Sequence, residues 1–135
     1  MNRLTQSIFA SLVLTALTMG VFSAAQSVGP ESVVRRWIRA VQSGDASSAS
    51  VLINQPLQSQ YSGWLIDAAA TLPAGSSTRL VSKQRSGSLV ILTTEHRVNP
   101  TMAAARYWVL QREGGKWRID PQRTYQFVDQ AVRMP

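Results

Sequence analysis

Cysteine is absent from this 135-residue chain, and histidine occurs once, at His96. Without cysteine the chain forms no disulfide and offers no thiolate to a metal ion or a redox reaction. One histidine cannot supply a two-histidine metal set, and the sequence contains neither an HExxH helix nor a GxSxG nucleophile turn. We therefore predict no metal site, no cofactor and no assignable catalytic residue.

Acidic residues are scarce, with 7 Asp+Glu against 14 Lys+Arg and a net charge of +7. Such a surface attracts anionic partners over long distances. The densest group is Arg35, Arg36 and Arg39, which we interpret as an anionic-surface patch suited to peripheral contact with an anionic membrane. The alternative is a solvated basic face with no partner. We predict no nucleic-acid partner, because no stacking aromatics alternate with the basic residues.

Charge is also missing between Arg3 and Glu31, where residues 8–22 are rich in Leu, Val, Ala and Met. A positive residue, an apolar stretch and the small residues Ser23-Ala24-Ala25 are typical of a secretory signal peptide. We predict a signal over residues 1–25, cleaved before Gln26, and one domain over residues 26–135. The protein would then be periplasmic or secreted. The alternative is an uncleaved membrane anchor over residues 4–25, because about 20 apolar residues span a bilayer.

Three helices are predicted in the first half of that domain. Pro30-Glu31 suits a first helical turn, and apolar residues then recur at helical spacing until Gly44. Asp45 can cap a short second helix, which Asn54-Gln55-Pro56 ends. A third pattern runs from Tyr61 to Leu72. The apolar faces of the three helices are Val34, Trp37, Ile38 and Val41; Ala46, Ala49, Leu52 and Ile53; and Tyr61, Trp64, Leu65, Ala68 and Leu72.

Strand patterns replace helical ones after the Pro73-to-Ser77 loop. Strands are predicted over residues 78–84, 88–98, 103–112 and 116–120. Gly114-Gly115 suits a tight hairpin, because paired glycines adopt positive φ angles. The segment from Thr124 to Val132 fits either a helix or a strand, so the structure of residues 122–135 stays open.

The first helix and the strand that ends with Asp120 resemble a known family. The run Pro30-Glu31-Ser32-Val33-Val34-Arg35-Arg36-Trp37, followed by Gly44-Asp45, is similar to the opening of the nuclear transport factor 2-like superfamily. The run Tyr107-Trp108-Val109-Leu110 through Trp117-Arg118-Ile119-Asp120 is similar to its final strands. The resemblance covers residues 30–121. It implies an α+β fold of the cystatin-like kind, with N-terminal helices packed on a curved, cone-shaped, four-stranded antiparallel sheet.

That superfamily includes isomerase and dehydratase-like enzymes beside many non-catalytic binding domains, so two functions are weighed. The first is an exported, non-catalytic binding or structural domain, acting through an apolar cavity or sheet face on a small apolar ligand or a protein. The alternative is a small cavity enzyme that uses His96 or a cavity carboxylate. Predicted cavity residues are Trp37, Tyr61, Trp64, His96 and Trp108. Asp67, Glu95 and Asp120 are interpreted as surface or structural residues.

The adjacent residues Tyr107 and Trp108 must point to opposite faces of the sheet. If Trp108 lies on the outer face, it forms a protein-docking surface with Arg106 and Arg112, because aromatic and Arg side chains dominate interface energies. If Trp108 faces inward, that surface does not exist. The resemblance also implies a homodimer through the sheet face.

Overall fold

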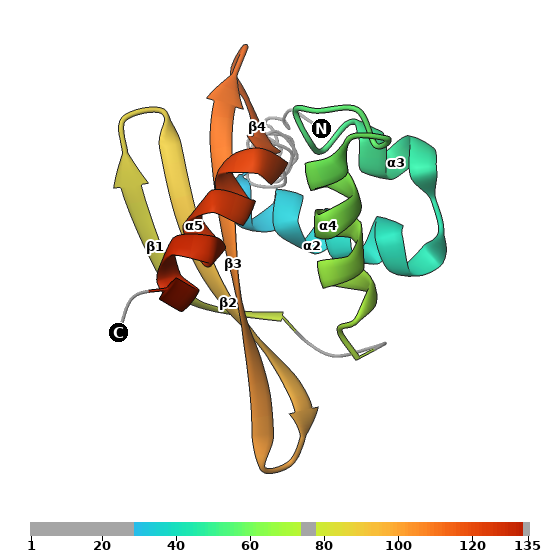
Figure 1. The fold of residues 1–135 in the computed structure, drawn as a ribbon, viewed down its shortest axis with the longest axis vertical. Coiled ribbons are helices and arrows are strands. Elements are labelled where there is room, and N and C mark those ends of the chain that lie inside the picture. The colour runs from blue at the N-terminus through green and yellow to red at the C-terminus, as the bar shows by residue number, and fades with distance from the viewer. Residues whose placement is uncertain (1–28, 74–77, 134–135) are drawn as a thin grey trace, which may run out of the picture. The chain divides into compact units, whose positions relative to one another are not determined.

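The computed structural model describes residues 29–73 and 78–133. The predicted signal, its cleavage site and the anchor alternative lie outside the described residues. Residues 33–135 form one compact unit. Its elements are the helices α2 to α4, the strands β1 to β4 and a final helix, α5 (Figure 1). No helix within the described ranges is both long and apolar enough to cross a membrane.

The three predicted helices are confirmed as α2 (Pro30–Ser43), α3 (Ala46–Ser50) and α4 (Gln60–Ala70). Gly44 follows α2 with a φ of 72°, and Asp45 caps α3 by accepting a hydrogen bond from the Ser48 backbone N–H at 3.2 Å. One detail differs, because Ala46 is exposed instead of facing inward. Since α3 is only five residues long, its cap and first turn stay in solvent, and burial begins at Ala49.

The four predicted strands are also confirmed, as β1 (Thr78–Ser86), β2 (Leu89–Asn99), β3 (Met102–Glu113) and β4 (Lys116–Ile119). They form one antiparallel sheet in the order β1-β2-β3-β4. Gly114 and Gly115 both have positive φ angles in the β3–β4 turn, as predicted. β4 is short and pairs only with the last part of β3, from Leu110 to Glu113. The earlier part of β3 therefore has a strand neighbour on one side only.

The main core lies on one face of the sheet, where alternate strand residues meet the helices. Its members include Val34, Trp37 and Ile38 of α2, Leu65 of α4, and Val90, Leu92, Trp108 and Leu110 of the sheet. Trp108 is 1% exposed. The docking surface predicted for an outward-facing Trp108 therefore does not exist. The reason is the strand register. Trp108 is paired with Leu92 of β2, and paired residues on neighbouring strands point to the same face of the sheet.

The ambiguous C-terminal segment is a helix, α5 (Pro121–Arg133), and it packs on β3. Figure 1 shows α5 crossing the sheet on the side away from α2. Val109 is 4% exposed although it lies outside the main core, because α5 covers the opposite face at this point. β3 is thus buried on both faces over three consecutive residues, from Trp108 to Leu110.

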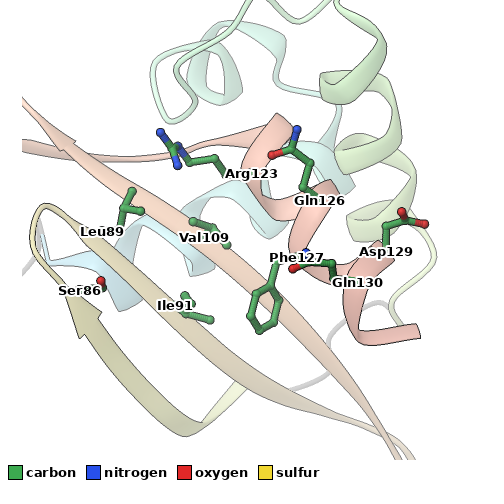
Figure 2. Close-up of a pocket in the computed structure, with 9 residues that line it drawn as sticks. All are labelled: Ser86, Leu89, Ile91, Val109, Arg123, Gln126, Phe127, Asp129 and Gln130. Atoms are coloured by element: carbon green, nitrogen blue, oxygen red, sulfur yellow. The ribbon is translucent and has the colours of Figure 1, made fainter. Parts of the chain in front are cut away.

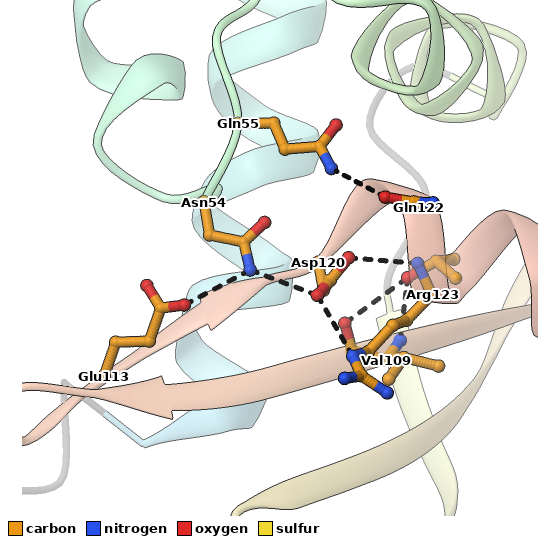
Figure 3. Close-up of polar contacts among 8 residues, drawn as sticks. Asn54, Gln55, Val109, Glu113, Asp120, Gln122 and Arg123 are labelled. Atoms are coloured by element: carbon orange, nitrogen blue, oxygen red, sulfur yellow. Dashed lines mark hydrogen bonds and ion pairs between the residues drawn. The ribbon is translucent and has the colours of Figure 1, made fainter.

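Asp120 joins the start of α5 to its neighbours (Figure 3), and Thr124 attaches the same turn to β3. Asp120 caps the helix, accepting a hydrogen bond from the Arg123 backbone N–H at 2.9 Å, and Pro121 occupies the first helical position, where a missing N–H costs nothing. The Thr124 hydroxyl accepts from the Val109 N–H at 2.9 Å, and the Asp120 N–H donates to the Val109 carbonyl at 2.8 Å. Asp120 is therefore structural, as interpreted from sequence.

Candidate functional site

A pocket of about 270 Å³ lies where α4, β3 and α5 meet. Its walls are mostly apolar, and Arg106 is the charged residue among them. Trp64 and Trp108, both predicted as cavity residues, line it together. The full lining is Trp64, Leu65, Ala68, Ala105, Arg106, Tyr107, Trp108 and Val128. Ligand sites in proteins are typically apolar hollows with a few polar groups, and this pocket is at the small end of their size range.

The pocket lies against the part of β3 that β4 does not reach. The backbone N–H and C=O of Val109 point toward this edge, where they bond with Thr124 and Asp120. Because backbone groups alternate in direction along an antiparallel strand, those of Tyr107 point the same way. The Tyr107 backbone donor and acceptor thus face the pocket edge, where no strand of the described residues pairs with them. The Ala105 carbonyl accepts a hydrogen bond from Arg106 Nη1 at 3.0 Å.

Three aromatic rings join α4 to α5 beside this pocket. The Tyr125 ring centroid lies 5.4 Å from that of Tyr61 and 5.2 Å from that of Trp64, the latter in an edge-to-face arrangement. Such pairs contribute about 0.5–1.5 kcal/mol beyond their buried area. Tyr61, another predicted cavity residue, therefore supports the wall through Tyr125, but it does not line the pocket.

His96 is fully buried behind the pocket wall and does not line the pocket. The Trp108 indole N–H donates to the Thr94 hydroxyl at 2.8 Å, and that hydroxyl lies 2.9 Å from His96 Nε2. We assign Thr94 as donor to Nε2, because Trp108 can only donate. The protonated Nδ1 then faces the Thr78 hydroxyl at 3.5 Å. Burial lowers the pKa of His96 below its ordinary value of 6.5, and the Arg106 guanidinium lowers that pKa further.

The remaining predicted cavity residue, Trp37, is a core residue with no exposed surface. Its indole N–H has no hydrogen-bond acceptor among the described residues. The carboxylates considered as catalytic bases also lie outside the pocket. Asp67 is exposed, and Glu95 forms a 3.0 Å ion pair with Arg79. No group of three His, Cys, Asp or Glu residues that could hold a metal ion occurs within residues 29–73 and 78–133.

Sequence reasoning missed Arg106 and Val128 as pocket residues. Val128 belongs to the segment whose secondary structure was left open, and the helical spacing of Tyr125, Val128 and Val132 was the available signal. Arg106 was considered only as part of an outer surface. It lies directly opposite Thr94 on β2, so its side chain starts on the helix-covered face.

A larger and more polar hollow, of about 530 Å³, lies on the opposite face of the sheet. Figure 2 shows Phe127 of α5 reaching over Ile91, with Leu89 and Val109 on the sheet beside it. Its charged groups are already paired, Arg123 with the capping residue Asp120 at 3.4 Å and Asp129 with Arg133 of α5 at 3.2 Å. Any dimer through this face would have to accommodate α5. We place the candidate site in the smaller pocket, because its walls are apolar and its one charge has no acidic partner in the described part of the chain.

The predicted anionic-surface patch, Arg35, Arg36 and Arg39, is exposed along α2. Arg36 and Arg39 line a surface hollow of about 400 Å³ that also contains Asp45 and Ser48. The three arginines are accessible to a partner, and the hollow does not connect them to residues of the pocket at α4.

No protein-family model matches the chain, and no curated protein matches its sequence. The solved structures that are similar to it include two proteins from bacteria. One, from Thiobacillus denitrificans, is described as a calcium/calmodulin-dependent protein kinase type II association domain; it is 15% identical with a TM-score of 0.47, covering 67% of this chain and 88% of its own. The other, from Cytophaga hutchinsonii, is described as an NTF2-like protein of unknown function; it is 13% identical with a TM-score of 0.38, covering 73% of this chain and 96% of its own.

These similarities concern the fold alone and assign no activity or partner. The element order and the curved four-stranded antiparallel sheet seen here agree with the architecture that the sequence resemblance implies. The fold of this chain is an α+β fold built from helices and one four-stranded antiparallel sheet.

Proposed function

We propose that this protein is an exported, non-catalytic binding domain that holds a small, largely apolar ligand in the pocket between α4, β3 and α5. Export rests on the signal-like pattern of residues 1–25. Binding rests on one observation, that Trp64 and Trp108 wall an apolar pocket where Arg106 is the one charged residue among the described residues that line it. An apolar ligand with a single anionic group fits these walls, because its body contacts the rings and its charge approaches the guanidinium.

The chemistry of the pocket favours binding over catalysis. A general base must reach the proton that it removes. No carboxylate or histidine is among the described residues that line this pocket, and His96 lies behind Trp108 with Nε2 engaged by Thr94. The alternative, an isomerase or dehydratase type of enzyme, would need His96 to leave these partners or a carboxylate to enter from elsewhere.

Filling the pocket provides the test. Ala68 lines it from α4, whereas Ala70 is exposed on the same helix. The probe is 2-naphthoate, an aromatic carboxylate, with uncharged 2-naphthamide for comparison, and binding is measured by calorimetry and tryptophan fluorescence. We expect Ala68→Leu to weaken 2-naphthoate binding about tenfold or more, because the added carbons occupy the ligand's space, and Ala70→Leu to leave it unchanged.

A second variant examines the charge. Arg106→Gln should weaken 2-naphthoate but not 2-naphthamide. Equal affinities in the wild type, Ala68→Leu and Ala70→Leu would contradict the pocket assignment. A molecule that is retained by the exported protein and converted to product by it would favour the enzyme alternative instead.

A further inference from the structure

A cluster of one tryptophan and two arginines lies away from the pocket, at the end of the sheet that carries the β1–β2 and β3–β4 turns. Trp117 of β4 is half-buried, and two guanidinium groups lie against its ring. The Arg85 guanidinium carbon is 5.9 Å from the ring centroid and that of Arg112 is 5.8 Å from it. Arg112 is directly opposite Trp117 in the β3–β4 pair, while Arg85 reaches in from β1, at the other edge of the sheet.

The indole ring holds both cations in place without neutralising them. A guanidinium within about 6 Å of an aromatic centroid is attracted to the ring face, and stacking leaves its N–H donors directed outward. Neither Arg85 nor Arg112 forms an ion pair with a carboxylate in the described part of the chain. Glu113, the acid next to Arg112 in sequence, points to the opposite face and lies 3.9 Å from Arg118.

Two positive charges lie beside the same ring, and an anion that accepts hydrogen bonds from either or both guanidinium groups would be stabilised by them. Both arginines are exposed, so an external anion can reach their donors. Arginine is the side chain best matched to phosphate, because its planar fork of N–H groups bonds two phosphate oxygens at once. A partly buried tryptophan that fixes two such forks is therefore better suited to a phosphate group than scattered surface arginines are.

We propose that Arg85, Arg112 and Trp117 form a binding site for a phosphate group, presented either as free phosphate or as the head group of an anionic phospholipid. This site is separate from the apolar pocket and from Arg35, Arg36 and Arg39. It does not depend on the function proposed for the pocket.

The first experiment follows Trp117 directly. The protein is labelled with 5-fluorotryptophan, which gives one ¹⁹F resonance for each of its four tryptophans, and Trp117→Phe assigns the relevant signal. Inorganic phosphate and pyrophosphate are then titrated at constant ionic strength. We expect a saturable shift of the Trp117 resonance that is lost in Arg85→Gln/Arg112→Gln.

The control is Arg97→Gln/Arg133→Gln, which also removes two positive charges, at exposed positions where Arg97 contacts the Pro100 carbonyl and Arg133 contacts Asp129. This control should keep the shift. Near-identical thermal unfolding of the two double variants verifies that the fold is intact.

The second experiment separates the two sources of phosphate. Co-sedimentation is measured with vesicles of phosphatidylcholine containing phosphatidylglycerol, and with phosphatidylcholine alone. If the lipid head group is the ligand, Arg85→Gln/Arg112→Gln should lower binding to the anionic vesicles about tenfold, and the control less than about twofold. A Trp117 shift with no vesicle binding identifies free phosphate as the source. The proposal is wrong if neither phosphate nor vesicles distinguish the two double variants.

Discussion

Thr94 is the residue that connects the single histidine of the chain to a wall of the pocket. Its hydroxyl accepts from Trp108 and donates to His96, and all three side chains are buried. Burying polar groups is tolerated when each has a partner, and removing one partner leaves the others with an uncompensated desolvation cost. The chain of contacts thus accounts for a histidine in an otherwise apolar core.

We predict that Thr94→Val destabilises the protein by about 1–3 kcal/mol, because the Trp108 N–H and His96 Nε2 both lose their partner. Urea unfolding monitored by circular dichroism measures the change. Thr93→Val is the matched control, since Thr93 lies on the other face of β2 and is half-buried; it should change stability by less than about 0.5 kcal/mol. Equal effects would show that the contact between Thr94 and Trp108 is not what matters.

The lowered pKa of His96 predicts a pH dependence of stability. The unfolded state, with the ordinary pKa of 6.5, takes up a proton before the folded state does. Stability should therefore be complete above pH 6.5 and decrease as the pH falls below 6.5 toward the folded-state pKa. His96→Gln should remove this slope between pH 7.5 and 5.5, a range above the ordinary titration of carboxylates. Denaturant midpoints at several pH values test it; parallel profiles for the two proteins would contradict the assignment.

At the scale of elements, α5 completes an edge that β4 leaves unfinished. β4 has only four residues and pairs with Leu110 to Glu113, so on this side of β3 the Val109 backbone bonds with Asp120 and Thr124 instead of a strand. The same connection positions Val128 over the pocket and Phe127 over the opposite face. One helix therefore shapes both hollows beside β3.

Asp120→Ala should destabilise the protein by about 1–2 kcal/mol, because the first turn of α5 loses its capping acceptor and Asn54 loses a contact of 3.2 Å. Asp120→Asn, which keeps an acceptor oxygen, should cost less. Thermal unfolding measures both. Asp129→Ala, a half-buried position later in α5, serves as the comparison and should cost less than about 1 kcal/mol, since its ion pair with Arg133 is largely accessible to solvent. A loss as large for Asp129→Ala would exclude capping as the cause.

At the scale of the whole molecule, the net positive charge favours contact with anionic partners. A chain with a net charge of +7 attracts anionic surfaces over distances that salt shortens. The arginines on α2 and those around Trp117 are two separate places where such attraction can become contact.

Intact-mass analysis of the protein recovered from the exported fraction tests the export proposal. We expect a mass that corresponds to a chain starting at Gln26, because Ser23-Ala24-Ala25 supplies the small residues that a signal peptidase requires. A full-length mass in the membrane fraction would favour the anchor over residues 4–25, and a full-length mass in the cytosol would contradict export.

The sequence predicted the elements well because each carried a local signal. Three such signals are the helical spacing of Trp37 and Ile38, the cap at Asp45 and the paired glycines before β4. Each acts within a few residues, so the secondary structure of each segment can be predicted separately. The candidate site was predicted only in part. Trp64 and Trp108 do line one pocket, whereas Trp37 is core, Tyr61 stands beside the pocket and His96 lies behind it.

What the sequence determined by itself was the order and type of the first seven elements, the absence of thiol chemistry and the basic charge. Tertiary structure alone decided that the C-terminal segment is a helix on the second face of the sheet, since its helix and strand patterns are equally good until β3 provides a surface and unpaired backbone groups. It also decided which way Trp108 points and that Arg85 meets Trp117 across the sheet. These outcomes depend on how strands and helices distant in sequence are paired. Strand register brings such residues together, and the hydrophobic pattern within a single strand does not indicate it.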